Sequence, residues 1–316
     1  MSETKSRVIR IPYDPDNREQ WLEMRRRGLG GSDAATVVGL NPYSSRLALY
    51  ADKLGLMPER DDNEAMRQGR DLEAYVAERW CEVTGKAVQR VNAILMNEEY
   101  PFALANIDRK VVGERAGLEC KTTSVYNNAD FAAGEIPPMY YTQCMHYLAV
   151  TGYDRWYLAV AVLNKAFYTF TIERDEAEID ALMAAERKFW EEHIARKIPP
   201  EADGSDASMA VLDNKVFVDD TAMLQDVDPL LDELERVSGI IKEYEEDKDN
   251  LKAQIIQRMG DRARGQALRW TVTYLPQERT SINKDRLLRQ YPQAYGDCVT
   301  TSTYRTFRVK KIKGEK

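Results

Sequence analysis

The sequence predicts a mixed α/β fold, written α/β or α+β, around one central sheet, followed by a separate helical appendage. Three observations predict it. Strand-like and helical segments mix without a regular repeat up to residue 196, a polar stretch with two prolines follows, and a long amphipathic helix comes next. We therefore expect a first domain at 1–197, a linker at 198–210 and an appendage at 211–316. A chain of 316 residues can bury a core and still carry such an appendage.

Glycines, prolines and capping residues delimit the elements of the first domain. Gly28 to Gly31 interrupts a short basic helix, Ser32 and Asp33 cap the next one, and Gly85 ends the longest. Pro137 and Pro138 mark a further break before a helix. Helices are expected at 21–27, 34–38, 46–54, 63–84, 127–134, 140–151 and 176–196. Strands are expected at 88–97, 103–112, 116–122, 156–162 and 166–172, the last two as a hairpin.

The appendage begins with a long helix. Apolar residues recur at spacings of four and three from Leu230 to Ile255, with Lys248 breaking the stripe, so we expect this face to pack on its own domain or on a neighbouring subunit. A small β/α tail is expected at 268–275, 284–290 and 298–312. The basic segment 305–313 alternates cations with apolar residues. It is either a solvated edge strand protected by lysines or a DNA-contacting strand.

Composition and charge restrict the class of protein. A hydrophobic content of 43% with 31% charged residues fits a soluble globular protein, and no apolar run is long enough to cross a membrane. The first residues lack an apolar signal core, so we expect a cytoplasmic protein. Four scattered cysteines and two histidines disfavour zinc and iron–sulfur sites. A net charge of −7 argues against a simple basic DNA-coating protein, but clustered carboxylates are what a magnesium site requires.

The segment 117–122 (Gly-Leu-Glu-Cys-Lys-Thr) carries the first chemical signal. Side chains alternate along a strand, so Glu119 and Lys121 point to one face, whereas Leu118, Cys120 and Thr122 point to the other. An isolated Glu-x-Lys is usually an ordinary solvent-exposed pair. Its position after Asp108 changes that expectation.

Asp108 ends the preceding strand-like stretch. Two carboxylates on adjacent strands can share a hard divalent cation, and the backbone carbonyl of Cys120 would supply a further oxygen ligand. Such an ion polarises a phosphodiester and lowers the pKa of bound water. Lys121 could then orient or deprotonate the attacking water, or stabilise charge on the phosphorane.

Two weaker patterns accompany these residues. Gly69 and Glu73 form a Gly-x-x-x-Glu on the expected helix 63–84, and Gln143 and Tyr147 form a Gln-x-x-x-Tyr on the helix 140–151. Alone, each is more often a solvated face or a packing pair.

Taken in order, Gly-x-x-x-Glu, Asp, Glu-x-Lys and Gln-x-x-x-Tyr resemble the PD-(D/E)XK nuclease superfamily. In particular, they resemble the phage exonucleases of the lambda exonuclease and YqaJ-like viral recombinase type. The opening stretches 21–25 (Trp-Leu-Glu-Met-Arg) and 30–33 (Gly-Gly-Ser-Asp) look like that family's first motif. The resemblance covers residues 21–194 and implies a restriction-endonuclease-like core, a central mixed sheet flanked by helices.

The resemblance also implies roles for individual residues. Asp108 and Glu119 match metal-binding acids and Lys121 matches a catalytic lysine. Glu73 matches an acid near the metal-bound water, and Gln143 matches a glutamine that lines the active site. Tyr147 is expected to contact the substrate. Arg25 and Ser32 match residues that hold a 5′-phosphate, which suits the bidentate grip of arginine. Asn106 stands where the lambda-type member has a serine; its amide can still donate a hydrogen bond to phosphate.

The implied function is a Mg²⁺-dependent exonuclease, with Mn²⁺ as a substitute, that resects linear duplex DNA from 5′ to 3′ and leaves 3′ tails for recombination. The implied partners are duplex DNA ends, a single-strand annealing recombinase and further copies of the chain in a ring trimer, inside a bacterial host. The competing functions are an endonuclease of the same superfamily and a catalytically silent DNA-binding or assembly protein on this fold.

Overall fold

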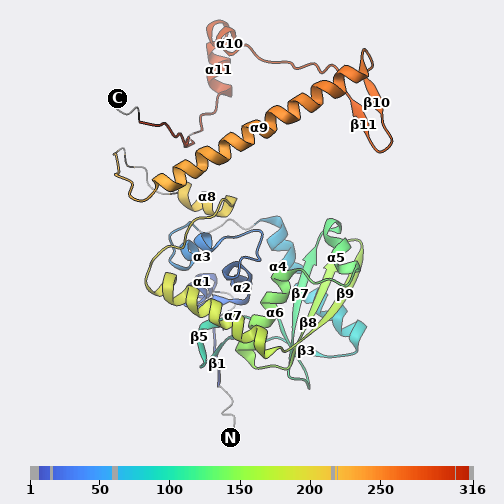
Figure 1. Ribbon diagram of the computed structural model, residues 1–316. Helices are drawn as coiled ribbons and strands as arrows, with labels where there is room; N and C mark the ends of the chain where they lie inside the picture. Colours follow the sequence, from blue (N-terminus) through green and yellow to red (C-terminus); the bar gives the residue numbers. More distant parts are fainter. Residues whose placement is uncertain are drawn as a thin grey trace. The chain divides into compact units, whose positions relative to one another are not determined.

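The computed structural model describes residues 7–14, 17–58, 63–214, 218, 220–302 and 304–312 (Figure 1). The chain forms two compact units, Met1–Val216 and Phe217–Lys316. Strands and helices are mixed throughout the first unit, which confirms the predicted mixed α/β class.

The first unit contains two sheets where the sequence predicted one. The four-stranded sheet has the order β1-β4-β5-β2, and the five-stranded sheet has the order β3-β6-β7-β8-β9. The expected strands 88–97 and 103–112 are each divided, because residues 90–93 and 106–108 pair with no strand and carry the chain from one sheet to the other. The strands are β1 (Val8–Ile11), β2 (Leu29–Gly30), β3 (Val88–Gln89), β4 (Ile94–Asn97), β5 (Tyr100–Ala105), β6 (Arg109–Val111), β7 (Ala116–Thr123), β8 (Arg155–Val162) and β9 (Ala166–Glu173).

Helices surround these sheets. The side chain of Asn63 caps the longest helix of the unit, and Gly85 ends it in a left-handed conformation with φ of 70°. The helices are α1 (Arg18–Arg26), α2 (Gly31–Val37), α3 (Arg46–Lys53), α4 (Glu64–Thr84), α5 (Asn128–Ala132), α6 (Pro138–Thr151), α7 (Glu176–Phe189) and α8 (Asp206–Asp213), with a 3₁₀ turn at Val125–Asn127 and a π-helical turn at Trp190–Ala195.

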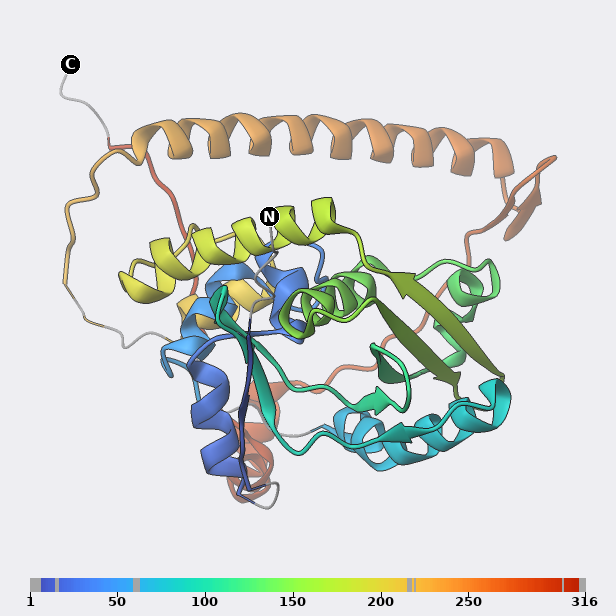
Figure 2. The same ribbon diagram turned by 90° about the horizontal axis from the view of Figure 1, so that it is seen from below.

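Strand β8 lies between β7 and the edge strand β9 of the five-stranded sheet, parallel to β7 and antiparallel to β9, which confirms the predicted hairpin. Its side chains alternate between two cores. Leu158 and Val160 pack in the core on the α6 side, whereas Tyr157 and Ala159 pack with Trp80 of α4. Helices α4 and α6 therefore cover opposite faces of the sheet, as Figure 2 allows the reader to follow.

The first unit extends further along the chain than the sequence predicted. Residues 206–213, placed partly in the expected linker, form α8, which packs on α3. Ser208 is fully buried and donates a hydrogen bond to the hydroxyl of Ser45, the N-cap of α3. This contact fixes the segment to the first unit, so the division falls after Val216 and not within 198–210.

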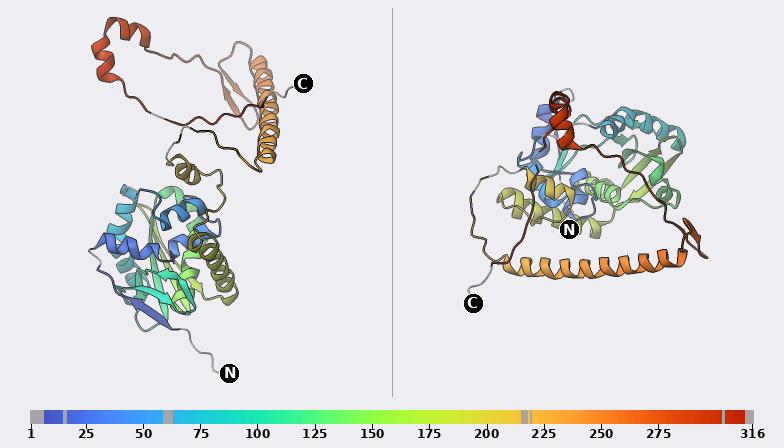
Figure 3. Two further views of the ribbon diagram at one scale, coloured as in Figure 1. Left: turned by 90° about the vertical axis from the view of Figure 1, so that its left-hand side faces the viewer. Right: turned by 90° about the horizontal axis from the view of Figure 1, so that it is seen from above.

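The second unit is dominated by one helix, α9 (Asp228–Met259) (Figure 3). None of the side chains of α9 is buried. A hairpin of β10 (Arg264–Gln266) and β11 (Thr271–Thr273) follows, then α10 (Lys284–Gln290) and α11 (Pro292–Cys298). The expected strand at 298–312 is not formed in the residues described there, and Lys313 lies outside them. Of the helices in the described ranges, none is both long and apolar enough to cross a bilayer.

Candidate active site

Strand β7 presents two of the predicted residues to helix α6. Glu119 and Lys121 lie opposite Leu158 and Val160 of β8, which face the α6 core. Leu118 belongs to the opposite core, under α4. The alternation predicted from the sequence is thus observed, and it turns a carboxylate and an ammonium towards Gln143 of α6.

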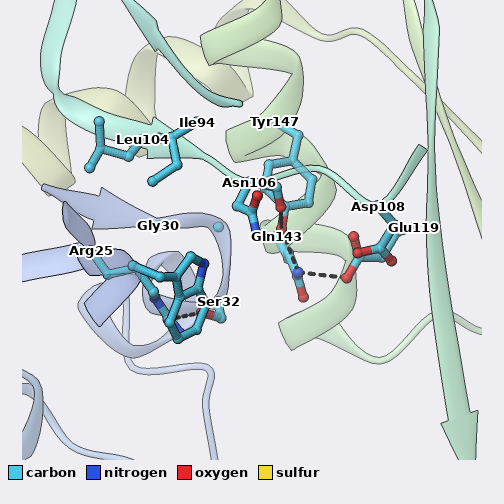
Figure 4. A pocket seen from close by; sticks show the side chains of 12 residues that line it. Arg25, Gly30, Ser32, Ile94, Leu104, Asn106, Asp108, Glu119, Gln143 and Tyr147 are labelled. Carbon is cyan, nitrogen blue, oxygen red and sulfur yellow. Dashed lines mark hydrogen bonds between the residues drawn. The ribbon is translucent and has the colours of Figure 1, made fainter. Parts of the chain in front are cut away.

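Glu119 is 3% exposed and lies within a compact polar cluster (Figure 4). Its Oε1 is 2.6 Å from Nζ of Lys121 and accepts a hydrogen bond of 2.7 Å from Nε2 of Gln143. The Lys121 ammonium also donates to Oε1 of Gln143 at 2.9 Å. Among the described residues, the other oxygen of Glu119, Oε2, has no hydrogen-bond partner although it is buried. A buried carboxylate oxygen without a donor is costly, so this atom is suited to a ligand.

Asp108 lies in the turn between β5 and β6, beside this cluster. Its Oδ2 accepts a 2.8 Å hydrogen bond from the backbone N–H of Cys120. Burial, followed by the charges of Glu119 and Glu73, raises the pKa of Asp108 well above its ordinary value, against the opposing effects of Lys121 and the Cys120 amide. Burial and the neighbouring carboxylates therefore outweigh Lys121 and the Cys120 amide in their effect on the pKa of Asp108.

Glu73 is placed by a residue that the sequence analysis missed. The guanidinium of Arg109, which is 6% exposed, pairs with Glu73 Oε1 and donates to the carbonyl of Asp108 at 2.7 Å. Glu73 on α4 is thus connected to the Asp108 turn through Arg109, and it does not line the cavity described below. The position of a cation directly after Asp108 was the only signal in the sequence.

The predicted phosphate-binding residues form a second group. Arg25 at the end of α1 donates from Nη2 to Oγ of Ser32 at 3.1 Å, and its guanidinium stacks over Trp21 at 4.7 Å from the ring centroid. Asn106 lies across from them, where its Oδ1 accepts a 3.3 Å hydrogen bond from the hydroxyl of Tyr13. The guanidinium of Arg25 is therefore already oriented by neighbours, towards the cavity.

A buried ion pair between Lys53 and Asp33 contacts the backbone of Arg25. Lys53 Nζ is 2.6 Å from Asp33 Oδ2 and donates to the backbone carbonyl of Arg25 at 2.9 Å. Burial alone would raise the pKa of Asp33, but the charges of Lys53 and Arg25 hold it below its ordinary value. Lys53 was not predicted, because a lysine at the end of a helix that also carries Arg46 and Asp52 gives no signal of its buried partner.

Tyr147 connects the two groups. Its hydroxyl accepts from Nε2 of Gln143 at 2.9 Å and donates to the carbonyl of Asn106 at 3.3 Å. A Cβ atom at Gly31 would lie 2.5 Å from Cε1 of Tyr147, so this approach of α2 to α6 requires glycine. Tyr147 is buried with its hydroxyl satisfied by the chain, which makes it a structural neighbour of the predicted site.

One cavity of about 170 Å³ brings both groups together. It is lined by Trp21, Arg25, Gly30, Gly31, Ser32, Ile94, Leu104, Asn106, Asp108, Glu119, Gln143 and Tyr147 (Figure 4). Seven of the predicted site residues, from positions 25 to 147 of the chain, therefore line this one cavity. A phosphate at Arg25 and a cation at the carboxylates would both face it.

The donor set can be compared with the needs of a metal ion. Within the described ranges, no group of three or more His, Cys, Asp or Glu side chains lies close enough to hold one. The predicted set is smaller, with Asp108, Glu119 and the carbonyl of Cys120, and all its donors are oxygens. Oxygen donors with an unpartnered buried carboxylate atom fit a hard cation such as Mg²⁺ better than a soft one. His146 is not a candidate ligand, because it is buried against Glu186 and the carbonyl of Leu104.

Comparison with known proteins agrees with the order of these motifs. Residues 20–154 match the sequence model of the family described as YqaJ-like viral recombinase domain. The chain is 35% identical over 306 residues to the uncharacterized protein YqaJ of Bacillus subtilis strain 168, and the match covers 94% of this chain and 95% of that protein. The chain belongs to the YqaJ family. Membership confirms the resemblance inferred from the motifs, and the family match includes every predicted site residue.

Among solved structures, this YqaJ-family chain is similar to an alkaline exonuclease, LHK-Exo, from Laribacter hongkongensis, with 22% identity, a TM-score of 0.49 and coverage of 56% of this chain and 93% of that one. It is also similar to a phage-related exonuclease from Haemophilus somnus 129PT, with 12% identity, a TM-score of 0.41 and coverage of 56% and 100%.

Proposed function

We propose that this YqaJ-family protein is a divalent-metal-dependent exodeoxyribonuclease that resects linear duplex DNA from 5′ to 3′ and leaves 3′ single-stranded tails. The observation that carries the proposal is the buried, unpartnered Oε2 of Glu119, which shares one cavity with Asp108 and with the arginine Arg25. Family membership and the ordered motifs support it.

In this proposal Asp108, Glu119 and the carbonyl of Cys120 hold Mg²⁺, for which Mn²⁺ can substitute. When bound, the ion polarises the phosphodiester and acidifies water. Lys121 is partly buried, which by itself would lower its pKa, but the charges of Glu119 and Asp108 raise that pKa above its ordinary value. As a cation, Lys121 is suited to stabilise negative charge on the scissile phosphate.

The remaining residues orient the reacting groups. Gln143 holds Glu119 and Lys121 in place through both ends of its amide. Glu73 acts on the Asp108 turn through Arg109. Arg25 and Ser32 bind the terminal 5′-phosphate, with Asn106 on the opposite wall, and this placement gives the 5′→3′ polarity.

Partners and location follow from the family. We propose that the enzyme acts on duplex DNA ends in the cytoplasm of a bacterium, as a phage or prophage product, and supplies single strands to an annealing recombinase. By resemblance to the lambda-type exonuclease, several copies assemble as a ring trimer.

Digestion of linear and covalently closed duplexes, each with Mg²⁺ and with EDTA, tests the proposal. Linear DNA labelled at either the 5′ or the 3′ end should lose the 5′ label first, only with metal, and closed circles should persist. Cleavage of closed circles would instead identify an endonuclease of this superfamily. Binding of DNA without cleavage under any metal would identify a catalytically silent protein.

A further inference from the structure

The β10–β11 hairpin of the second unit has one half-buried face and one free face. Gly265 and Val272 pair across the two strands, and a Cβ atom at Gly265 would lie 3.6 Å from Cγ of Met259, the last residue of α9. At Gly265 this face of the hairpin therefore lies beside the end of α9, which the hairpin follows in the chain (Figures 1 and 3). Because side chains alternate along a strand, Arg264 and Gln266 point the other way, and both are exposed.

The partner strand contributes to the same free face. Thr271 and Thr273 pair with Gln266 and Arg264, respectively, and both threonines are exposed. The free face thus presents a guanidinium, an amide and two hydroxyl groups, all of which can hydrogen-bond to phosphate oxygens.

The hairpin turn exposes a tryptophan. The turn is closed by a 2.8 Å hydrogen bond from the Ala267 N–H to the Trp270 carbonyl, so Leu268 and Arg269 form its tip. Trp270 is 75% exposed, whereas Trp80 and Trp156 of the first unit are fully buried. An indole ring left in water on an ordered turn gains nothing from folding, and such rings are enriched where a protein binds a ligand.

Positive charge is concentrated in the same part of the chain. Residues 262–312 carry eleven lysines and arginines against three acidic residues, within a chain of net charge −7. Around the hairpin, Arg262, Arg264 and Arg269 form no ion pair with any other residue that the structure describes. The acidic side chains of the unit lie mainly on α9, where several of them pair with basic residues of the same helix. The hairpin arginines are left without counter-charges.

An exposed aromatic ring among unpaired arginines matches single-stranded DNA better than duplex DNA. The ring can stack on a base only where the base face is accessible, and the cations contact the backbone phosphates. Because the rest of the chain is acidic overall, the DNA backbone would be attracted to this basic segment and not to the whole protein surface.

We propose that the β10–β11 hairpin is a single-stranded DNA-binding site, in which a strand crossing the turn stacks a base on Trp270 and places backbone phosphates at Arg269 of the tip and at Arg264 of the free face. Single-strand binding here is independent of the nuclease assignment, because it involves a different unit and no metal. In an enzyme that exposes a 3′ tail, such a site would hold the product strand.

Fluorescence anisotropy of a labelled single-stranded thymidine oligonucleotide, with the full-length chain in EDTA, tests this site without cleavage. Trp270→Ala should weaken binding by about tenfold, and Trp270→Phe should restore most of the loss because it keeps a stacking ring. Arg264→Ala should reduce the slope of log affinity against log salt by about 0.7, the value for one phosphate contact on a single strand. The matched controls are Tyr244→Ala and Lys242→Ala on α9. Tyr244 is exposed to a similar extent, at 70%, and both controls should bind as wild type does.

The outcomes separate the alternatives. Equal affinities for wild type and Trp270→Ala, with circular dichroism unchanged, would overturn the proposal. Binding to phosphatidylserine vesicles is measured in parallel. If Trp270→Ala loses vesicle binding but keeps oligonucleotide binding, the single-strand proposal is overturned and the hairpin binds a membrane surface instead. An equal loss of affinity for closed circular duplex would contradict base stacking. A protein that does not cleave DNA could still give every binding result expected here. Failure of the nuclease proposal is therefore distinguishable from failure of the single-strand binding proposal.

Discussion

The side-chain amide of Gln143 donates from Nε2 to Oε1 of Glu119 across 2.7 Å. The other end of the same amide accepts from Lys121, so its orientation is fixed: a flipped amide would direct its NH₂ group at an ammonium. Gln143 therefore occupies one oxygen of Glu119 and leaves the other free for a ligand.

Replacing Gln143 should impair this arrangement without unfolding the protein. We expect Gln143→Ala to lower metal affinity or cleavage by about ten- to a hundredfold, as is usual when a partner of a metal ligand is lost. Mg²⁺ titration of the cleavage rate measures this. Thr142→Val, at the neighbouring position on α6, where the hydroxyl donates to the Pro138 carbonyl of the same helix, should behave as wild type does. Wild-type rates at all Mg²⁺ concentrations for Gln143→Ala would refute the positioning role.

Arg25 should determine the preference for a phosphorylated end. We expect wild type to degrade 5′-phosphorylated duplexes faster than 5′-hydroxyl duplexes, and Arg25→Ala to slow mainly the phosphorylated substrate, because a charge-assisted contact is lost. Time courses on both substrates measure the ratio. Arg27, which pairs with Glu23 at 2.6 Å on the surface, is the matched control. Identical ratios for Arg25→Ala and wild type would remove Arg25 from the phosphate pocket.

Lys53 should be important for stability, because it neutralises the buried Asp33. We expect Lys53→Met to lower the free energy of unfolding at neutral pH by about 3–5 kcal/mol, since it leaves a buried carboxylate unpaired. The pKa of Asp33 is depressed in the folded state, so the stabilisation is present above the unfolded pKa of about 3.9 and lost as pH falls through the folded value. Urea denaturation at neutral and acidic pH should show the gap between wild type and variant narrowing on acidification. If the stability difference between wild type and Lys53→Met widened on acidification, the Lys53–Asp33 pair would not be the cause of that difference.

His146 and Glu186 should make stability fall at alkaline pH. Nδ1 of His146 lies 2.8 Å from Glu186 Oε1, and Nε2 lies 3.0 Å from the carbonyl of Leu104, so the buried pair retains one proton between its two members. For His146, burial lowers the pKa, but the carboxylate of Glu186 raises it above the ordinary value overall; burial raises that of Glu186. A raised folded pKa gives stability that is present below the unfolded value, about 6.5 for histidine, and lost as pH rises through the folded value.

Denaturation midpoints between about pH 6 and about pH 9 test this pair. Wild type should lose stability as pH rises, and the double variant His146→Leu with Glu186→Leu should show a flatter profile. Parallel profiles for the two proteins would mean that other groups carry the alkaline dependence.

Local patterns predicted the strands that carry the site, but not every contact that completes it. The alternation in 117–122 placed Glu119 and Lys121 on one face, because period-two geometry needs no tertiary information. Arg109 and Lys53 could not be predicted, since their roles depend on partners 36 and 20 residues away in sequence, respectively. The number of sheets was wrong for a similar reason: an apolar strand does not indicate which sheet it joins.

The boundary of the first unit and the small elements of the second also escaped prediction. Residues 206–213 are short and polar at their start, and only the buried contact of Ser208 with Ser45 shows that they belong to the first unit. β10 carries Gly265 and two polar residues, a composition that weakens any strand signal.

The central claim is that Glu119 and its neighbours form a metal-dependent nuclease site, and single-turnover cleavage of 5′-labelled linear duplex tests it most directly. Wild type should release the label with Mg²⁺ and not with EDTA. Glu119→Gln keeps the shape of the side chain but removes its charge. This variant should remain folded, and its cleavage rate should be at least about a hundredfold lower than that of wild type. Cleavage by wild type in EDTA, or by Glu119→Gln at the wild-type rate, would contradict the account.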